Sequence, residues 1–388
     1  MDLDAFRWLL TDDGAQLLAR ARQVADRPAL AQQAELRRHA TPERVAAALT
    51  QAGLRQRAVA KFGDDAARLW FTSDGLEQAT RRRVADHRAA RLRAFGAGTL
   101  LDLGCGIGGD LMAAARVGVT AAGVDLDPLR VAVAQANLAA LGLPGAVVVA
   151  DAADVDPAPF DVVFVDPARR GARGRTFSPD DWTPPWPLVA SLLERDACAK
   201  LAPGIPHDLV PDGVEAEWVS DDGEVKEAAL WSGRLATCAR RATVISGGGL
   251  ATLTEDDDPG APVVPLGRYL HEPDGAVIRA GLVTAVAARL DGGLLDEHIA
   301  YVTTDSPDAT PFSRAYAVQE VLPYREKALR TALRERGIGR LTIKKRGVDV
   351  VPEQLRRRLD LRGDAEATIV LTRIAGEGAC VLVEPLAR

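Results

Sequence analysis

A glycine-rich loop between an apolar run and a long helical pattern constrains this chain more than any other segment. Residues 99–110 read Thr-Leu-Leu-Asp-Leu-Gly-Cys-Gly-Ile-Gly-Gly-Asp. Glycines at this spacing let the backbone turn tightly off a strand and approach a ligand closely. The helix that follows directs its free N–H groups toward that ligand. The segment therefore predicts a strand–loop–helix unit with a nucleotide-type pocket.

Two commoner nucleotide-binding loops do not fit this spacing. A phosphate-binding loop needs Lys-Ser/Thr after its last glycine, and neither residue follows here. A dinucleotide fingerprint, Gly-x-Gly-x-x-Gly, has no acid in front of it, whereas Asp102 stands two residues before Gly104. A carboxylate beside the loop repels a pyrophosphate and suits a ligand that carries an amine and hydroxyls.

Acidic residues close four successive strand patterns. Apolar runs at 119–124, 146–150 and 161–165 follow the first strand, and the carboxyl ends of parallel strands meet at one edge of a sheet, where open α/β sheets bind ligands. One terminal aspartate is usually a cap or a turn residue, but four at one edge favour a ligand site. The four acids are Asp102, Asp125, Asp151 and Asp166.

These segments resemble the successive motifs of class I S-adenosylmethionine-dependent methyltransferases. The resemblance covers about residues 99–170 and implies an α/β fold with a Rossmann-like seven-stranded methyltransferase sheet. It also implies S-adenosyl-L-methionine as the cofactor. The matching segments are Asp102-Leu-Gly-Cys-Gly-Ile-Gly108, Val124-Asp125-Leu126-Asp127-Pro128, Ala150-Asp151-Ala152 and Val165-Asp166-Pro167.

The same resemblance implies roles for single residues. The glycine loop would face the methionine part of the cofactor and Asp125 would hold the ribose hydroxyls. Asp151 and the Ala152 backbone would read the adenine, while Asp166 and Pro167 would line the substrate side. The residues expected to bind the cofactor are therefore Asp102, Gly104, Cys105, Gly106, Gly108, Asp110, Asp125, Leu126, Asp151, Ala152 and Asp166.

The flanks extend the resemblance to the trimethylguanosine-synthase-like branch, which methylates guanine amino groups in RNA. The whole chain looks most like bacterial methyltransferases with a THUMP-like C-terminal domain, and because THUMP domains bind RNA, an RNA partner is implied. The segments behind this resemblance are Lys61-Phe62, Trp70-Phe71-Thr72, Gly75-Leu-Glu-Gln-Ala-Thr80, Gly108-Gly109-Asp110, Gly267-Arg-Tyr-Leu-His-Glu-Pro-Asp274, Ala276-Val-Ile-Arg279 and Ile343-Lys-Lys-Arg-Gly347.

The acceptor side rests on Asp166-Pro-Ala-Arg-Arg170. Methyl transfer is an in-line displacement, so positioning supplies much of the rate. The Asp166 carboxylate and the Pro167 carbonyl could accept hydrogen bonds from an exocyclic amine. Arg169 and Arg170 could clamp a phosphate or pair with acids such as Asp180 and Asp181. Asp166, Pro167 and Arg169 are the predicted catalytic residues.

Many amino-methylating enzymes place an aromatic residue soon after the corresponding proline, and this chain does not. Phe177, Trp182 or Trp186 could stack on a flipped-out base instead, or could pack a loop against the domain. The acceptor atom therefore remains open between a purine amino and a ring nitrogen. The wider set of candidate substrate residues is Phe71, Thr72, Arg170, Phe177, Trp182, Lys344, Lys345 and Arg346.

Positive charge is concentrated in two flanks, although the formal net charge is −6. Residues 1–98 carry 17 Lys and Arg against 12 Asp and Glu, and residues 313–363 carry 14 against 6. Basic patches supply the sequence-independent part of nucleic-acid binding, although arginine runs are usually solvated helix faces. Lys344-Lys345-Arg346 follows a strand pattern and ends in a glycine turn, which would focus its charge at a loop.

Composition bounds the remaining possibilities. Four scattered cysteines lack Cys-x-x-Cys spacing, which argues against a metal site or a disulfide framework and suits a reducing cytoplasm. No stretch approaches the length of a membrane span, and the first residues lack a signal-peptide pattern. We therefore expect a cytoplasmic protein that uses no metal and no membrane, with an oligomeric state that the sequence leaves open.

Three domains are expected within 388 residues. Residues 1–95 predict a helical domain, with Thr11, Thr41 and Thr72 at helix starts. Residues 96–258 predict the cofactor-binding sheet, with later strands near 199–201, 215–220 and 242–245 and a linker at 247–258. Residues 261–388 predict an α+β domain, with helices near 275–290 and 324–336 and strands near 315–321, 340–344, 367–373 and 379–384.

Three functions are compatible with these patterns. The first is methylation of a base nitrogen in tRNA or rRNA, which the strand-end acids and basic flanks favour. The second is an enzyme of the same fold that acts on a small molecule or a protein. The third is a non-catalytic RNA-binding or ribosome-assembly factor with a relic pocket, and the intact cofactor motifs weigh against it.

Overall fold

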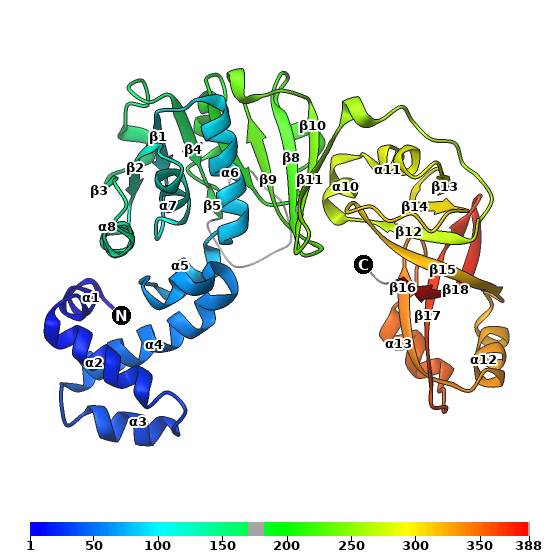
Figure 1. The fold of residues 1–388 in the computed structure, drawn as a ribbon, viewed down its shortest axis with the longest axis horizontal. Helices are drawn as coiled ribbons and strands as arrows, with labels where there is room; N and C mark the ends of the chain where they lie inside the picture. The colour runs from blue at the N-terminus through cyan, green and yellow to red at the C-terminus, as the bar shows by residue number, and fades with distance from the viewer. Residues whose placement is uncertain (170–181, 387–388) are drawn as a thin grey trace. The chain divides into compact units, whose positions relative to one another are not determined.

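The computed structural model describes residues 1–169 and 182–386, and contacts divide the chain into two compact units. The first unit comprises Met1–Leu201, His207–Val214 and Ala229–Ala236. The second comprises Ala202–Pro206, Glu215–Ala228 and Thr237–Arg388. The chain therefore passes between the units several times, and Figure 1 follows it from the blue N-terminus to the red C-terminus.

Six helices precede the first strand of the first unit (Figure 1). The expected helix starts are confirmed: Thr11, Thr41 and Thr72 are N-cap residues, and the Thr11 and Thr72 side chains each accept a backbone N–H from the following turn. Helix α4 packs on α1, α2 and α5. The helices are α1 (Leu3–Leu9), α2 (Asp12–Gln23), α3 (Ala29–Leu36), α4 (Pro42–Phe62), α5 (Ser73–Gln78) and α6 (Arg82–Phe95).

The central sheet has nine strands in the order β11-β10-β8-β9-β7-β4-β1-β2-β3. Parallel pairing joins β1 to β2 and β4, β2 to β3, and β4 to β7. The strands are β1 (Thr99–Leu103), β2 (Thr120–Asp125), β3 (Ala146–Val149), β4 (Val162–Val165), β7 (Ala197–Leu201), β8 (Glu215–Asp221), β9 (Glu224–Trp231), β10 (Arg240–Ser246) and β11 (Gly249–Thr254). The predicted α/β class is confirmed.

This sheet has two strands more than the seven expected, and two-residue connections explain the difference. Asp222 and Gly223, both with positive φ, join β8 to β9, which is the backbone that a tight hairpin turn requires. Gly247 and Gly248 join β10 to the antiparallel β11. The expected linker at 247–258 is therefore largely a hairpin, because paired glycines form turns as readily as flexible joints.

Helices of the first unit bury the strands that carry the pocket. Helix α7 (Gly109–Arg116) packs on β1, β2 and α6, and α8 (Pro128–Leu141) packs on β2 and β3. One apolar core cluster joins residues of the N-terminal helical region, such as Phe62 and Phe71, to loop and strand residues such as Ile107 and Phe164. The N-terminal helices and the sheet thus share a core. Two short elements, β5 (Ala168–Arg169) and β6 (Trp182–Thr183), pair with each other, and α9 (Trp186–Leu192) follows.

The C-terminal part of the second unit is an α+β domain, as expected, around a seven-stranded sheet of order β13-β14-β12-β15-β18-β17-β16. The expected helix over 275–290 is interrupted at Gly281, which adopts a left-handed conformation and caps the first half. The elements are β12 (Tyr269–Pro273), α10 (Gly275–Ala280), α11 (Val283–Arg289), β13 (Gly293–Asp296), β14 (Ile299–Thr304), β15 (Ser313–Leu322), α12 (Glu326–Glu335), β16 (Ile338–Lys345), α13 (Pro352–Leu359), β17 (Ala365–Ile374) and β18 (Glu377–Pro385).

Candidate active site

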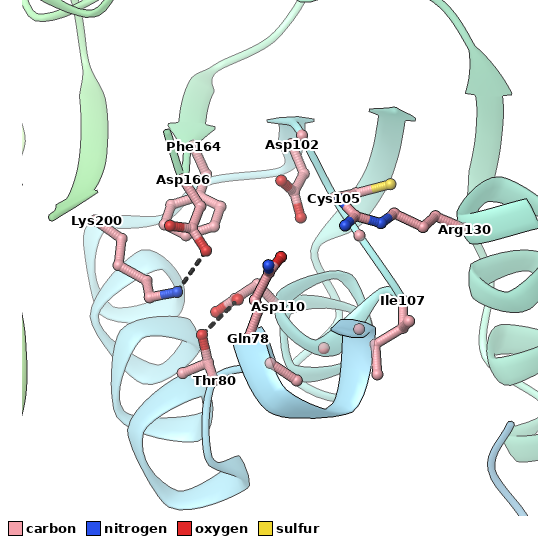
Figure 2. A pocket seen from close by; sticks show the side chains of 15 residues that line it. Gln78, Thr80, Asp102, Cys105, Ile107, Asp110, Arg130, Phe164, Asp166 and Lys200 are labelled. Atoms are coloured by element: carbon pink, nitrogen blue, oxygen red, sulfur yellow. Dashed lines mark hydrogen bonds and ion pairs between the residues drawn. The ribbon is translucent and has the colours of Figure 1, made fainter. Parts of the chain in front are cut away.

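A cavity of about 360 Å³ lies where the carboxyl ends of β1, β4 and β7 meet the glycine loop and helix α5 (Figure 2). Its volume falls in the range of about 300–1,000 Å³ that is usual for small-molecule sites. The cavity is lined by Gly75, Gln78, Ala79, Thr80, Asp102, Gly104, Cys105, Gly106, Ile107, Gly109, Asp110, Arg130, Phe164, Asp166 and Lys200. The strand-end position is the one predicted from the sequence.

The glycine loop takes a backbone path that side chains would strain. Gly104, Gly106 and Gly108 have φ values of 93°, 56° and 83°. A Cβ on Gly108 would also lie 3.2 Å from the Ala134 Cβ on α8, so the loop packs closely on that helix. The Gly104 and Cys105 N–H groups both donate to the Val124 carbonyl, which joins the loop to the end of β2.

Asp102 is a buried carboxyl group, and one of its oxygens has no partner among the described residues. Its side chain is 1% exposed, lines the cavity, and its Oδ1 atom has no hydrogen-bond partner in the described part of the chain (Figure 2). Burial, followed by the charges of Asp110 and Asp166, raises the pKa of Asp102 well above its usual range. A cationic ligand group at this position would supply the missing donor and the opposite charge.

Asp110, in the first turn of α7, is held by two side chains from the N-terminal helical region. The Thr80 Oγ1 donates to its Oδ2 at 3.1 Å, and the Arg88 guanidinium of α6 forms an ion pair with its Oδ1. The guanidinium carbon of Arg88 also lies 4.5 Å from the centre of the Phe164 ring, which lines the same cavity. The helical region therefore fixes one wall of the site.

Asp166, directly after β4, faces the cavity from another side. Its carboxylate forms an ion pair with the ammonium of Lys200, which comes from β7, and the Asp166 side chain is 33% exposed (Figure 2). The cavity thus contains an unpartnered, deeply buried carboxylate at Asp102 and a paired, partly accessible one at Asp166. Such different environments suit different tasks, one in binding a cation and the other in meeting an incoming substrate.

Asp125 ends β2 and organises the backbone next to the loop. The Gly106 N–H donates to its Oδ2 at 3.0 Å, and the Asp127 N–H donates to its Oδ1 at 2.9 Å. Its side chain does not line the cavity as described. Leu126, Asp151 and Ala152 also lie outside the lining, and Leu126 and Asp151 are exposed beyond β2 and β3. The cavity therefore brings together most of the predicted cofactor residues that lie at the glycine loop and at the ends of β1 and β4, but not those at or just after the ends of β2 and β3.

Several lining residues were not assigned a role from the sequence. Gln78, Ala79 and Thr80 fall in a segment that the family resemblance quotes, but nothing in their residue types indicates a ligand. Lys200 and Arg130 carried no local signal, because only the tertiary fold brings β7 and α8 to the loop. A strand that ends beside a predicted acid is the one clue that could have pointed to Lys200.

Three of the predicted substrate residues, Phe71, Thr72 and Trp182, have structural partners. Phe71 is fully buried and packs on Phe62, with ring centres 5.4 Å apart. Thr72 caps α5 by accepting the Gly75 N–H at 3.0 Å. Trp182 is buried and meets Trp186 edge-on at 5.6 Å, which favours the packing alternative for that ring. These positions shape the unit around the cavity rather than line it.

In the part of the chain that the structure describes, the remaining predicted residues of the acceptor side and the cofactor loop do not form further contacts with the cavity that assign them a role. Pro167 follows Asp166 and is partly buried, and the backbone of Arg169 pairs with Trp182 in the β5–β6 ladder. Arg170 and Phe177 lie outside the described residues. The Cys105 thiol lines the cavity, but burial and the charge of Asp102 raise its pKa, so the thiol stays protonated at neutral pH. Among the described residues, no cluster of three or more His, Cys, Asp or Glu side chains could hold a metal ion.

The basic triplet of the second unit is distributed over different contacts. The Lys344 ammonium forms a 2.5 Å ion pair with Glu272 and lies 5.5 Å from the centre of the Tyr316 ring. The guanidinium carbon of Arg346 lies 5.5 Å from the centre of the Tyr301 ring. Lys345 is exposed. The triplet is therefore not a uniform loop of free charge, since β-strand alternation turns Lys344 toward the domain and Lys345 toward solvent.

Comparison with known proteins gives three family matches. A methyltransferase domain matches residues 100–169, a THUMP domain-like family matches residues 313–385, and a domain of unknown function matches residues 2–58. In the part of the chain that the structure describes, no helix is long and apolar enough to cross a membrane. The predicted methyltransferase and THUMP-like regions are confirmed.

Relatives extend these matches over most of the chain. Two uncharacterized S-adenosylmethionine-dependent methyltransferases from Mycobacterium tuberculosis, of strains CDC 1551 and H37Rv, are each 41% identical over 335 residues, which is 83% of this chain and 90% of theirs. A crystal structure of a candidate methyltransferase from Porphyromonas gingivalis W83 has the same fold, with a TM-score of 0.78 and 21% identity over 98% of this chain and all of that one. The chain therefore belongs to the S-adenosylmethionine-dependent methyltransferases.

Proposed function

We propose that this enzyme transfers the methyl group of S-adenosylmethionine to a base nitrogen in tRNA or rRNA. The observation that carries the choice of RNA is the THUMP-like domain, which shares a chain with the cofactor cavity and whose residues 313–363 carry 14 Lys and Arg against 6 Asp and Glu. Because THUMP domains are RNA-binding domains, this arrangement supports an RNA acceptor over a small molecule or a protein. The predicted three-domain layout, 1–95, 96–258 and 261–388, is part of this proposal.

The cavity fits the cofactor at its amine end. The orphaned Oδ1 of Asp102 needs a hydrogen-bond donor, and the ammonium of the methionine part is one. The glycine loop leaves room for close approach of the backbone, and Asp110 of α7, which is partly buried, already pairs with Thr80 and Arg88. Asp102 is therefore the residue that we assign to the cofactor amine. Asp125, Asp151 and Ala152 are assigned to the ribose and adenine by family resemblance.

The acceptor is assigned to the side of the cavity that holds Asp166. When bound, the cofactor supplies an electrophilic methyl group on a sulfonium, so this chain has to orient a nucleophile and receive a proton. The carboxylate of Asp166 and the carbonyl of Pro167 can accept hydrogen bonds from a base amine. The ion pair with Lys200 fixes the direction of the Asp166 carboxylate. Arg169 is proposed to contact the phosphate backbone of the acceptor.

RNA contacts are assigned to basic side chains that the second unit does not use internally. Some arginines are engaged, such as Arg358 with Glu326 and Arg336 with Glu320. Others have no ion pair among the described residues and are exposed. These are Arg325, Lys327, Lys345 and Arg357, from the start of α12, the end of β16 and helix α13. Exposed, unpaired cations release counterions on binding phosphates and supply sequence-independent affinity.

Mass spectrometry of nucleosides from a deletion strain and its parent tests the proposal. We expect one methylated nucleoside to disappear from tRNA or rRNA and to return with the wild-type gene, but not with Asp166→Ala. Unchanged tRNA and rRNA nucleosides would overturn the proposal and favour a small-molecule or protein acceptor. Full restoration by Asp166→Ala would favour a non-catalytic RNA-binding or ribosome-assembly factor instead.

A further inference from the structure

Lys61 stands in the last turn of α4 and reaches the end of the neighbouring helix α5. Its ammonium donates to the carbonyls of Leu76, Glu77 and Ala79 at 2.8, 2.5 and 2.9 Å. These carbonyls close α5, where backbone acceptors have no partner within the helix. An ammonium carries three N–H groups, so one side chain can serve all three acceptors from a single point. Its positive charge also lies at the negative end of the helix dipole.

Helix α5 needs such support because it is only six residues long. A helix of that length is not stable by itself in water. Its first turn is closed by the Thr72 side chain, which accepts the Gly75 N–H, and its last turn is closed by Lys61. The two caps come from residues outside the helix, so its position is fixed by α4 and by the segment that precedes it.

The same short helix forms a wall of the cofactor cavity. Gly75, Gln78, Ala79 and Thr80 all line it, whereas Lys61 does not. Gln78 and Thr80 are seen at the cavity in Figure 2. The helix also lies tightly on the glycine loop, since a Cβ on Gly75 would come within 2.5 Å of the Ile107 Cγ2 atom. Any displacement of α5 would therefore change both the cavity wall and the loop beneath it.

We propose that Lys61 is a positioning residue for cofactor binding, which sets the α5 wall of the cavity by holding three backbone carbonyls. This inference deepens the function above, since it rests on the cavity being the S-adenosylmethionine site. The domain that supplies Lys61 and α5 is thereby a working part of the cofactor site. Lys61 acts through backbone geometry alone and touches no reacting atom.

The test compares Lys61→Met with Arg57→Met, an exposed position on the same helix four residues earlier. Both variants lose one positive charge, but only the first loses the three carbonyl contacts. With S-adenosylhomocysteine as the calorimetric probe, we expect Lys61→Met to raise its Kd about tenfold and Arg57→Met to leave it unchanged. Hydrogen exchange at the amides of 75–80 should accelerate only in Lys61→Met.

Lys61→Arg provides a second variant if Lys61→Met does not fold. A planar guanidinium keeps the charge but cannot converge on three carbonyls as an ammonium does, so its Kd should fall between those of the wild type and Lys61→Met. A lower melting temperature with an unchanged Kd in both variants would overturn the proposal and leave Lys61 a structural residue. Failure of the wild type to bind S-adenosylhomocysteine would instead refute the cavity as the cofactor site.

Discussion

Asp102 and Lys344 are charged side chains in different surroundings. Asp102 is 1% exposed and Lys344 is 26% exposed, and of the two only Lys344 forms an ion pair in the described structure. Lys344 pairs with Glu272 across 72 residues of sequence, beside the Tyr316 ring. Asp102 has three further aspartates near it and an Oδ1 without a hydrogen-bond partner in the described structure. A charged side chain with a partner supports the fold, whereas a buried carboxyl oxygen without a donor that also lines a cavity can meet a bound ligand.

Asp102→Asn should give the largest effect and the clearest contrast. The amide cannot neutralise the cofactor ammonium, so we expect the Kd for S-adenosylmethionine to rise about 100-fold or more. Calorimetric titration measures this, with Asp127→Asn as a control, because asparagine caps α8 as well as aspartate does. An affinity within threefold of the wild type would mean that Asp102 does not meet the cofactor.

The same substitution should stabilise the ligand-free protein. The pKa of Asp102 is raised above the ordinary 3.8, so the unfolded chain releases this proton at a lower pH than the folded one. The carboxyl therefore makes stability fall as pH rises from about 3.8 through the raised pKa. Denaturant unfolding across that pH range should show a smaller fall in the free energy of unfolding for Asp102→Asn than for the wild type. If the free energy of unfolding depends on pH equally in the variant and the wild type, Asp102 is not the buried, uncompensated carboxyl group that we describe.

Lys200→Met should separate catalysis from cofactor binding within the same cavity. It removes the partner of Asp166 and leaves Asp102 untouched, so we expect methyl incorporation from labelled S-adenosylmethionine into total RNA of a deletion strain to fall about tenfold. The Kd for S-adenosylhomocysteine should stay within threefold. Lys226→Met, which breaks the ion pair with the exposed Glu224, is the matched control. Equal loss of affinity and rate would place Lys200 in cofactor binding.

Lys344→Met should act on the fold alone. It leaves Glu272 without its ammonium partner, and we expect a loss of about 1–2 kcal/mol in the free energy of unfolding. The Kd for S-adenosylmethionine should not change. Chemical denaturation and calorimetry measure the two quantities on one preparation. If RNA affinity falls while stability is unchanged, Lys344 belongs with the RNA contacts, as its sequence context predicted.

Arg357→Gln should give the smallest effect, a two- to fivefold weaker binding of total tRNA. Each lost phosphate contact lowers the slope of log K against log salt by about one. Arg340→Gln is the matched control, because Arg340 is exposed but already paired with Glu366 at 2.6 Å. Identical salt slopes for both variants and the wild type would mean that α13 does not contact RNA.

The cofactor loop could be predicted from the sequence because its signal is local. Glycines with positive φ and an acid on the preceding strand are properties of consecutive residues, and the parallel order of the strands then brings Asp102 and Asp166 to one cavity. Lys200 and Thr80 could not be predicted in this way. They come from elements far apart in the chain, and only packing brings them to Asp166 and Asp110.

The second unit shows the same limit for charge. In the sequence Lys344-Lys345-Arg346 looks like one basic loop. In the structure Lys344 pairs with Glu272 on another strand, and nothing in the sequence around Lys344 indicates that pairing. Strand β9 was missed for a different reason. Its first half is charged, so it lacks the apolar pattern of the strands around it, and the only local signal for it is the Asp222-Gly223 turn.

The interleaving of the two units has a consequence for how the protein is made and dissected. The first unit is complete only at Ala236, after residues 215–228 of the second unit have already been synthesised. Cleavage at one position therefore cannot separate the two units. A fragment that ends at residue 236 also contains residues 202–206 and 215–228, which belong to the second unit. During synthesis these residues emerge before Thr237–Arg388, which is the larger part of the unit to which they belong.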